Sequence, residues 1–298
     1  MYAKWTVRAE NVVNVINSLT EGIHNICVVG EIDEDTVKSI GSTLRSNENA
    51  KVNLNLSGTF GLESIPYQAF SKCSNLINID FPQSVTSISD YAFSNCTSLT
   101  NIKLPESITS IGSFTFYGCT NLTSIELSEN ITTIGGYTFQ NCTSLINIKL
   151  PKSVTSIFDN AFYGCTNLTD IKLPASVIYI GRTVFCLCTS LTNIELPSSV
   201  DIHFSVFAEC TSLTNVKILE GLTYISDYVF YECTSLTDIE IPTSVTMIGR
   251  SVFYGCSNLT TVNYMGTIEQ WKKIDINEKE NDSLLSAKII CTDGIINE

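Results

Sequence analysis

The sequence predicts a solenoid: a right-handed stack of similar coils with a parallel β-sheet on one face and a cap at each end. Phenylalanine recurs every 23 residues from Phe70 to Phe185 and, after one 22-residue step, continues to Phe253. A cysteine follows three places after each, from Cys73 to Cys256. Each repeat also carries an L-x-x-I-x-L segment, usually followed by proline. A period of about 20–50 residues is typical of solenoids, and we expect about nine to ten coils.

Residues 1–50 lack the repeat and are predicted to form an α/β cap. Apolar residues of 9–19 follow helical spacing, 25–32 alternates like a strand, and 33–44 carries acids in the first turn of a predicted helix, where they favour the helix dipole. The segment 51–58 is predicted to be the strand that enters the solenoid.

The repeats occupy 51–264. In the coil that contains Leu99, Ile102 and Leu104, these three side chains should point inward, and Pro105, which has no N–H for a ladder, marks the end of the strand. A Val-x-x-Ile pair lines the return side of most coils. One coil cannot bury these residues alone, so each coil should serve as the wall of the next. The nine stacked cysteines cannot all pair, because their number is odd, and matching rotamers in successive coils should point their sulfurs the same way. We therefore expect free thiols.

Residues 265–298 are predicted to form an α+β cap that covers the last coil. A helix should begin at Thr267, with a capping box to Gln270, and 286–294 should form the last strand. A cap is expected because an open solenoid end would present an unpaired strand and bare core.

Composition and motifs argue against several classes of function. The net charge of −13 repels phosphate backbones and anionic lipids, so neither nucleic acid nor membrane insertion is expected. There are only two histidines, and no phosphate loop, dinucleotide fingerprint, nucleophile elbow, zinc or calcium pattern is present. We therefore expect no enzyme, no catalytic residues, no cofactor and no metal. The first ten residues lack the features of a secretory signal.

One column of charged residues lies between the Ile and Leu of successive strands and should project from the β face. Its signs alternate at most steps, so the column is interpreted as a ladder that stabilises stacking, with a partner-binding surface as the alternative. The column comprises Asp80, Lys103, Glu126, Lys149, Lys172, Glu195, Lys217 and Glu240.

Aromatic residues flank the core phenylalanines and should form a ridge beside or opposite the strands. Packing over the turns is one interpretation, and a contact surface for protein or glycan is the other, because tyrosine is enriched in interfaces. The candidates that follow the core ring are Tyr117, Tyr163, Tyr231 and Tyr254; those that precede it by two are Tyr91, Phe114, Tyr137 and Tyr228.

The unit "AFYGCTNLTDIKLPASV" (161–177) resembles the BspA-like leucine-rich repeat, a 23-residue variant of bacterial and protist surface proteins. The resemblance implies a leucine-rich repeat solenoid that binds an extracellular-matrix or cell-surface protein. It also implies a location at the cell surface or outside the cell, and a role in adhesion and virulence. An intracellular scaffold or secreted effector that binds protein is the alternative. The identity of the partner and the oligomeric state stay open at this point.

Overall fold

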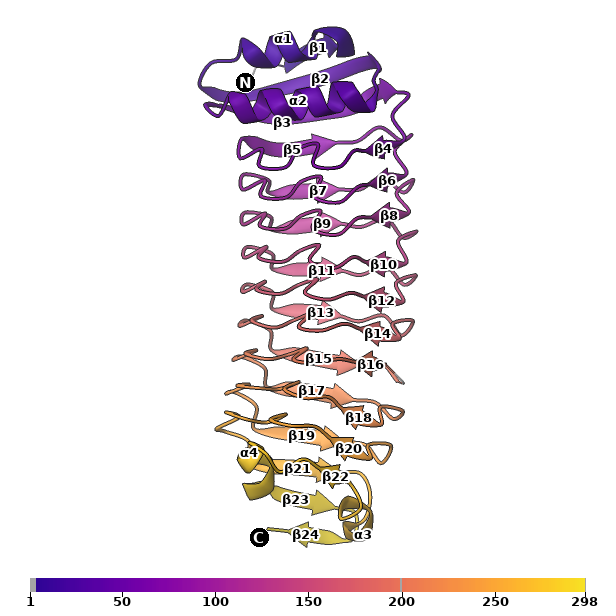
Figure 1. Cartoon of the computed structure of the whole chain (residues 1–298), viewed down its shortest axis with the longest axis vertical. Helices are drawn as coiled ribbons and strands as arrows, with labels where there is room; N and C mark the ends of the chain where they lie inside the picture. Colours follow the sequence, from indigo (N-terminus) through magenta and orange to yellow (C-terminus); the bar gives the residue numbers. More distant parts are fainter. Residues whose placement is uncertain (1–3, 199, 298) are drawn as a thin grey trace. The chain divides into compact units, whose positions relative to one another are not determined.

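The computed structural model describes residues 4–198 and 200–297. It divides into two compact units, Met1–Ser153 and Val154–Glu298. Within each unit the coils carry two parallel ladders: a main sheet of longer strands, and a return ladder of two-residue strands. Figure 1 shows the alternation of long and short strands along the chain. The predicted leucine-rich repeat solenoid is confirmed.

The first unit opens with the predicted helices and strands and with one strand, β1 (Lys4–Arg8), that the sequence analysis did not predict. The strands β1, β2 (Gly22–Glu31), β3 (Ala50–Phe60) and β5 (Leu76–Asp80) pair in parallel in that order, so the main sheet begins inside the predicted cap and runs directly into the repeats. The elements are β1 (Lys4–Arg8), η1 (Ala9–Asn11), α1 (Val12–Asn17), β2 (Gly22–Glu31), α2 (Glu34–Ser46) and β3 (Ala50–Phe60).

Helix α2 covers the end of the solenoid by close approach to the first coil. A Cβ on Gly41 would lie 1.8 Å from the Ala69 carbonyl oxygen, so only glycine fits there. The buried Asn75 amide donates to the carbonyls of Leu44, Asn47 and Ala50, at 2.8–3.0 Å. One side chain of the first coil thereby ties together the C-terminal end of α2 and the start of β3.

The remaining strands of the first unit belong to the coils. The main strands are β5 (Leu76–Asp80), β7 (Asn101–Lys103), β9 (Ser124–Glu126) and β11 (Asn147–Lys149); the return strands are β4 (Ser64–Ile65), β6 (Ser87–Ile88), β8 (Ser110–Ile111) and β10 (Thr133–Ile134).

The core of each unit contains a stack of phenylalanine rings. In the first unit the centroids of Phe70, Phe93 and Phe116 are 5.3 and 5.6 Å apart, with nearly parallel planes. In the second unit Phe185 and Phe207 are 5.5 Å apart, so the 22-residue step preserves the stack. Each fully buried ring contributes roughly 1.5–3 kcal/mol.

The second unit repeats the same arrangement. Its main strands are β13 (Asp170–Lys172), β15 (Asn193–Leu196), β17 (Asn215–Ile218), β19 (Asp238–Ile241), β21 (Thr261–Tyr264), β23 (Lys288–Cys291) and β24 (Gly294–Ile296); its return strands are β12 (Ser156–Ile157), β14 (Tyr179–Ile180), β16 (Asp201–Ile202), β18 (Tyr224–Ile225), β20 (Met247–Ile248) and β22 (Asp275–Ile276).

The C-terminal segment forms an irregular further coil. Helix α3 (Ile268–Trp271) begins at Thr267 with the predicted capping box, then β22 extends the return ladder, and after α4 (Asp282–Ser286) strand β23 extends the main sheet. The strand predicted within 286–294 is present as β23, but it is not the last, because β24 (Gly294–Ile296) follows and pairs antiparallel with it. This hairpin covers the edge that parallel stacking would leave open.

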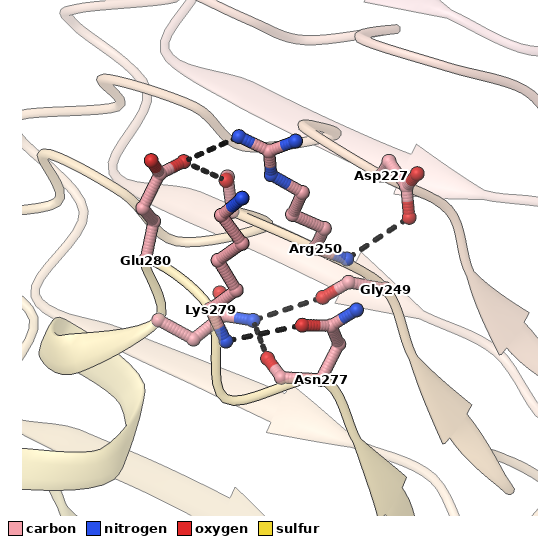
Figure 2. A network of polar contacts seen from close by, with 8 residues as sticks. Asp227, Gly249, Arg250, Asn277, Lys279 and Glu280 are labelled. Atoms are coloured by element: carbon pink, nitrogen blue, oxygen red, sulfur yellow. Dashed lines mark hydrogen bonds and ion pairs between the residues drawn. The ribbon is translucent and has the colours of Figure 1, made fainter.

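Polar contacts fasten this segment to the last regular coil (Figure 2). The Arg250 side chain donates to a Glu280 carboxylate oxygen at 3.3 Å, and its backbone N–H donates to the Asp227 carboxylate at 2.9 Å. The backbone N–H of Arg182 donates to the Asp159 carboxylate in the same way, at 2.8 Å. The fully buried Asn281 side chain donates to the Gly249 carbonyl at 2.8 Å and accepts from the Phe253 N–H at 3.1 Å. The Asn281 side-chain amide thus makes two hydrogen bonds that backbone groups of a further regular coil would otherwise make.

Candidate partner-binding surfaces

The charged column of the first unit lies on the exposed β face as predicted, but its pairing is not a continuous ladder. Lys103 and Glu126 form an ion pair with a 2.8 Å Nζ–Oε2 distance, and this pair raises the pKa of Lys103. Lys149 instead reaches Glu129, in the turn after β9, at 3.0 Å, and this contact lowers the pKa of Glu129. Lys149 thus pairs with a residue outside the column, whereas the ladder interpretation requires pairs between members of the column.

In the second unit the same column borders a shallow groove of about 630 Å³. Lys172, Glu195 and Lys217 line it, and Lys217 pairs with Glu195 at 2.8 Å. Leu173, Pro197 and Leu219 contribute apolar surface. Glu240 stands opposite Lys217 in the sheet register but does not line the groove. The groove offers a partner both charge signs in equal measure and no aromatic anchor.

The tyrosines that follow the core rings differ in their surroundings. Tyr231 and Tyr254 stack at 5.0 Å, and Tyr254 is exposed. Tyr163 is half-buried, and burial raises its pKa. Tyr117 lies 6.0 Å from Phe114 and lines a groove in the first unit. Of these four tyrosines, Tyr117 is the one placed beside the aromatic groove of the first unit.

The rings that precede the core phenylalanines form the most ordered aromatic feature of the first unit. Tyr91 and Phe114 stack with centroids 4.5 Å apart, and Phe114 and Tyr137 with centroids 4.3 Å apart, both pairs within 6° of parallel. Tyr67 meets Tyr91 edge-on at 5.9 Å. We call Tyr91, Phe114 and Tyr137 the aromatic row; all three are half-buried. The predicted ridge is present here.

The backbone of the aromatic row is in a conformation that bulky residues rarely adopt. Tyr91, Phe114 and Tyr137 have φ of 58°, 57° and 60°. This conformation lets the N–H of Tyr91 and Phe114 donate to the next coil at 3.0 Å. Equivalent positions in the second unit hold Asn160 and Ser205, with φ of 57° and 56°. The coil therefore requires positive φ but not an aromatic residue, and left-handed conformations of such residues cost roughly 1–2 kcal/mol.

A groove of about 490 Å³ runs beside the aromatic row. Polar side chains of Gln68, Asn95, Gln140 and Lys72 complete its walls together with Tyr117. The sequence analysis missed these polar residues. One signal was present: Lys72 is the only basic residue at its place in the repeat, which otherwise holds Asn95, Gly118, Asn141, Gly164, Leu187, Glu209, Glu232 and Gly255.

Comparison with protein families now identifies the repeat. A model described as the BspA type leucine-rich repeat region, in six copies, matches residues 63–189 and 155–275. The chain belongs to the BspA-type leucine-rich repeat family. Leucine-rich repeat regions of this kind are typical protein-binding modules. No curated protein matches the chain.

Several solved structures are similar to this BspA-type chain. A leucine-rich repeat protein of T. pallidum is 31% identical, with 60% of this chain and 72% of that chain covered and a TM-score of 0.48. A leucine-rich cell surface protein of Faecalibacterium prausnitzii is 24% identical, with coverage of 87% and 76% and a TM-score of 0.46. A leucine-rich repeat protein of Bacteroides ovatus is 22% identical, with coverage of 80% and 92% and a TM-score of 0.39.

Within residues 4–198 and 200–297, no three His, Cys, Asp or Glu side chains gather as a metal site requires. No helix in these same ranges has the length and apolar character needed to cross a bilayer. His203 lies 3.2 Å from an Asp201 carboxylate oxygen at the surface of the return ladder.

Proposed function

We propose that this chain is a non-catalytic protein-binding module of a cell surface, an adhesin for a host-matrix protein or a protein of a neighbouring cell. The observation that carries the proposal is the aromatic row, three stacked rings on strained backbone beside a groove. Because Asn160 and Ser205 hold the same positive φ, the coil itself does not require bulky rings at these positions. Tyrosine provides large, rigid contact area at low entropic cost, which suits protein interfaces.

Membership of the BspA-type family supports the same proposal, since the family is associated with adhesion to matrix proteins and to other cells. The charged column is proposed as a secondary surface. Its two signs balance, and its ion pairs are exposed, so it favours stacking and solubility over capture of a partner of one charge.

The test is binding of the purified chain to immobilised fibronectin, laminin and collagen and to cultured epithelial cells. The variant Tyr91→Asn/Phe114→Asn/Tyr137→Asn should lose binding and still fold, because Asn160 shows that asparagine suits this backbone. Tyr228→Asn, at the equivalent position of the second unit (φ 60°), is the matched control and should bind normally.

Other outcomes would count against the proposal. If the wild-type chain binds none of these proteins or cells, the adhesin function is wrong. If Lys172→Glu/Lys217→Glu abolishes binding while the aromatic-row variant does not, the partner binds the groove of the second unit instead. Antibody labelling of intact source cells tests the proposed surface location, and labelling only after permeabilisation would contradict it.

A further inference from the structure

A second hollow extends the groove of the aromatic row toward helix α2. The two hollows share Gln68, Ser71 and Lys72, and the second, of about 350 Å³, adds Lys38 and Arg45. No Asp or Glu among the described residues lines either hollow. This is unusual on a chain with 30 acidic and 17 basic residues. We call Lys38, Arg45 and Lys72 the basic end of the groove.

The three basic side chains are held in different ways. Arg45 is fixed by donation from one nitrogen, Nη1, to the carbonyls of Ala69 and Ser71, at 3.3 and 2.9 Å. Its guanidinium has further N–H groups beyond that nitrogen. Lys72 is exposed on a residue with φ of 60°.

Lys38 is the exception, because neighbouring acids on its own helix offset its charge. Its Nζ lies 3.3 Å from Asp35 and 3.9 Å from Glu34. In the described residues no acid lies within 4.0 Å of the charged atoms of Arg45 or Lys72. The positive charge of the basic end therefore rests mainly on Arg45 and Lys72.

The stacked rings contribute to the same electrostatic character. Both faces of Phe114 are covered, one by Tyr91 and the other by Tyr137, so the ring can present only its edge to a ligand. An aromatic ring has a negative face and a positive edge. Phe114 therefore turns a weakly positive, apolar edge toward the groove, next to the amide groups of Asn95 and Gln140.

The central ring of the row, Phe114, offers no free face to a ligand that binds by stacking. Nucleobases bind sequence-tolerant sites by stacking on ring faces, and the covered faces of Phe114 cannot serve. Two uncompensated basic groups are also few for a phosphate backbone on a chain of net charge −13. A carboxylate-bearing peptide needs only ring edges, amide donors and a basic end, and the groove supplies all three.

We propose that this groove binds an extended acidic segment of the protein partner, with carboxylates at the basic end and apolar side chains along the aromatic row. This inference rests on the proposed function and names the chemistry of the partner. Charge complementarity should make the binding salt-sensitive, as for other interfaces steered by opposite charge.

The probe is a fluorescein-labelled twelve-residue peptide of alternating Glu and Tyr, measured by fluorescence polarisation with the full chain. Matched peptides replace every Glu by Gln or by Lys, and a labelled twelve-nucleotide oligo-dT tests nucleic acid. The Glu-Tyr peptide should bind best, and its affinity should fall as salt is raised from about 50 mM to about 500 mM.

Two charge variants locate the site. Lys72→Glu should weaken binding about tenfold or more. The variant should fold, because Glu209 and Glu232 occupy equivalent positions with φ of 59° and 55°. Glu232→Lys, at that equivalent position in the second unit, is the control and should not change the affinity. Phe114→Asn should also weaken binding, at unchanged or higher thermal stability.

The outcomes separate this inference from the proposed function. Equal binding of the Lys-Tyr or Gln-Tyr peptide, or tighter binding of oligo-dT, overturns the inference. So does a Lys72→Glu chain that binds the Glu-Tyr peptide like the wild type. A chain that binds matrix protein but no acidic peptide retains the function and loses the inference. A chain that binds the peptide through the groove but binds no matrix protein or cell retains the inference and contradicts the proposed function.

Discussion

The core cysteines form hydrogen bonds to the backbone of the preceding coil. The Sγ of Cys96 lies 3.0 Å from the Phe70 carbonyl oxygen, and Cys119 and Cys142 make the same contact at 3.1 Å to Phe93 and Phe116. The thiol thus donates to the preceding coil, which alanine could not do and serine would do with a shorter bond. All twelve cysteines are free thiols in the structure.

These thiols should be inert until the chain unfolds. Burial raises the pKa of Cys119 and of Cys256 to about 12, so at pH 8 they carry almost no reactive thiolate. Iodoacetamide at pH 8 should label the half-buried Cys27 first in the native chain, and all twelve cysteines after denaturation without reductant, as read by mass spectrometry. Native labelling of Cys119 before Cys27, or a mass that shows four or more disulfides, would contradict this account.

The charged column makes a second prediction at the residue scale. Glu126→Lys removes the pair with Lys103, and Lys149→Glu removes the pair with Glu129, so both should lower the denaturant midpoint, and less so at high salt. Because Lys149 lowers the folded-state pKa of Glu129, the stabilisation by that pair is present above the unfolded pKa and disappears as pH falls through the lowered value. The difference between Lys149→Gln and wild type should vanish there; a difference that persists would show that the pair does not cause it.

At the scale of elements, the sequence predicts the repeated strands and the helices with clear local signals, and it misses short strands outside the repeat such as β22 and β24. The 23-residue period places the core rings and both ladders, because identical coils need identical residues. Strand β22 lies outside the 23-residue repeat. Asp275 and Ile276 join the return ladder by backbone pairing with β20, which residue types do not specify. The aromatic ridge could be predicted, but its positive φ depends on hydrogen bonds to the next coil, which residue types do not specify.

The C-terminal segment can be tested through one side chain. Asn281→Ala should leave the Gly249 carbonyl without the amide and the Phe253 N–H without an acceptor inside the fold. Such loss costs about 1–3 kcal/mol per buried group, so the free energy of unfolding should fall by about 2 kcal/mol or more. Lys272→Ala, at an exposed position of the same segment, is the control and should change little. Hydrogen exchange should rise first at 249–256; equal stability of the two variants would refute this role for Asn281.

Deletion of 265–298 should have a larger effect of the same kind. Strand β21 loses its partner β23, and β20 loses β22, so the last regular coil presents two open edges. The truncated chain should aggregate or lose amide-exchange protection from Val262 backward. A monomeric truncation with full protection at Val262 would mean that the segment is dispensable for stability.

For the molecule as a whole, the repeat makes stability local. Phe116 packs against Phe93 and Phe139, each at 5.6 Å, and a coil of a solenoid contacts only its neighbours. Phe116→Ala should therefore cost about 3–5 kcal/mol in the coils it touches. Hydrogen-exchange mass spectrometry should show faster exchange at 93–139 and no change at 230–256. A chain with one shared core would lose protection everywhere, and uniform loss in this variant would contradict the local account. Local stability also has a functional consequence, because substitutions in the aromatic row can then be assigned to binding while the distant coils report an intact fold.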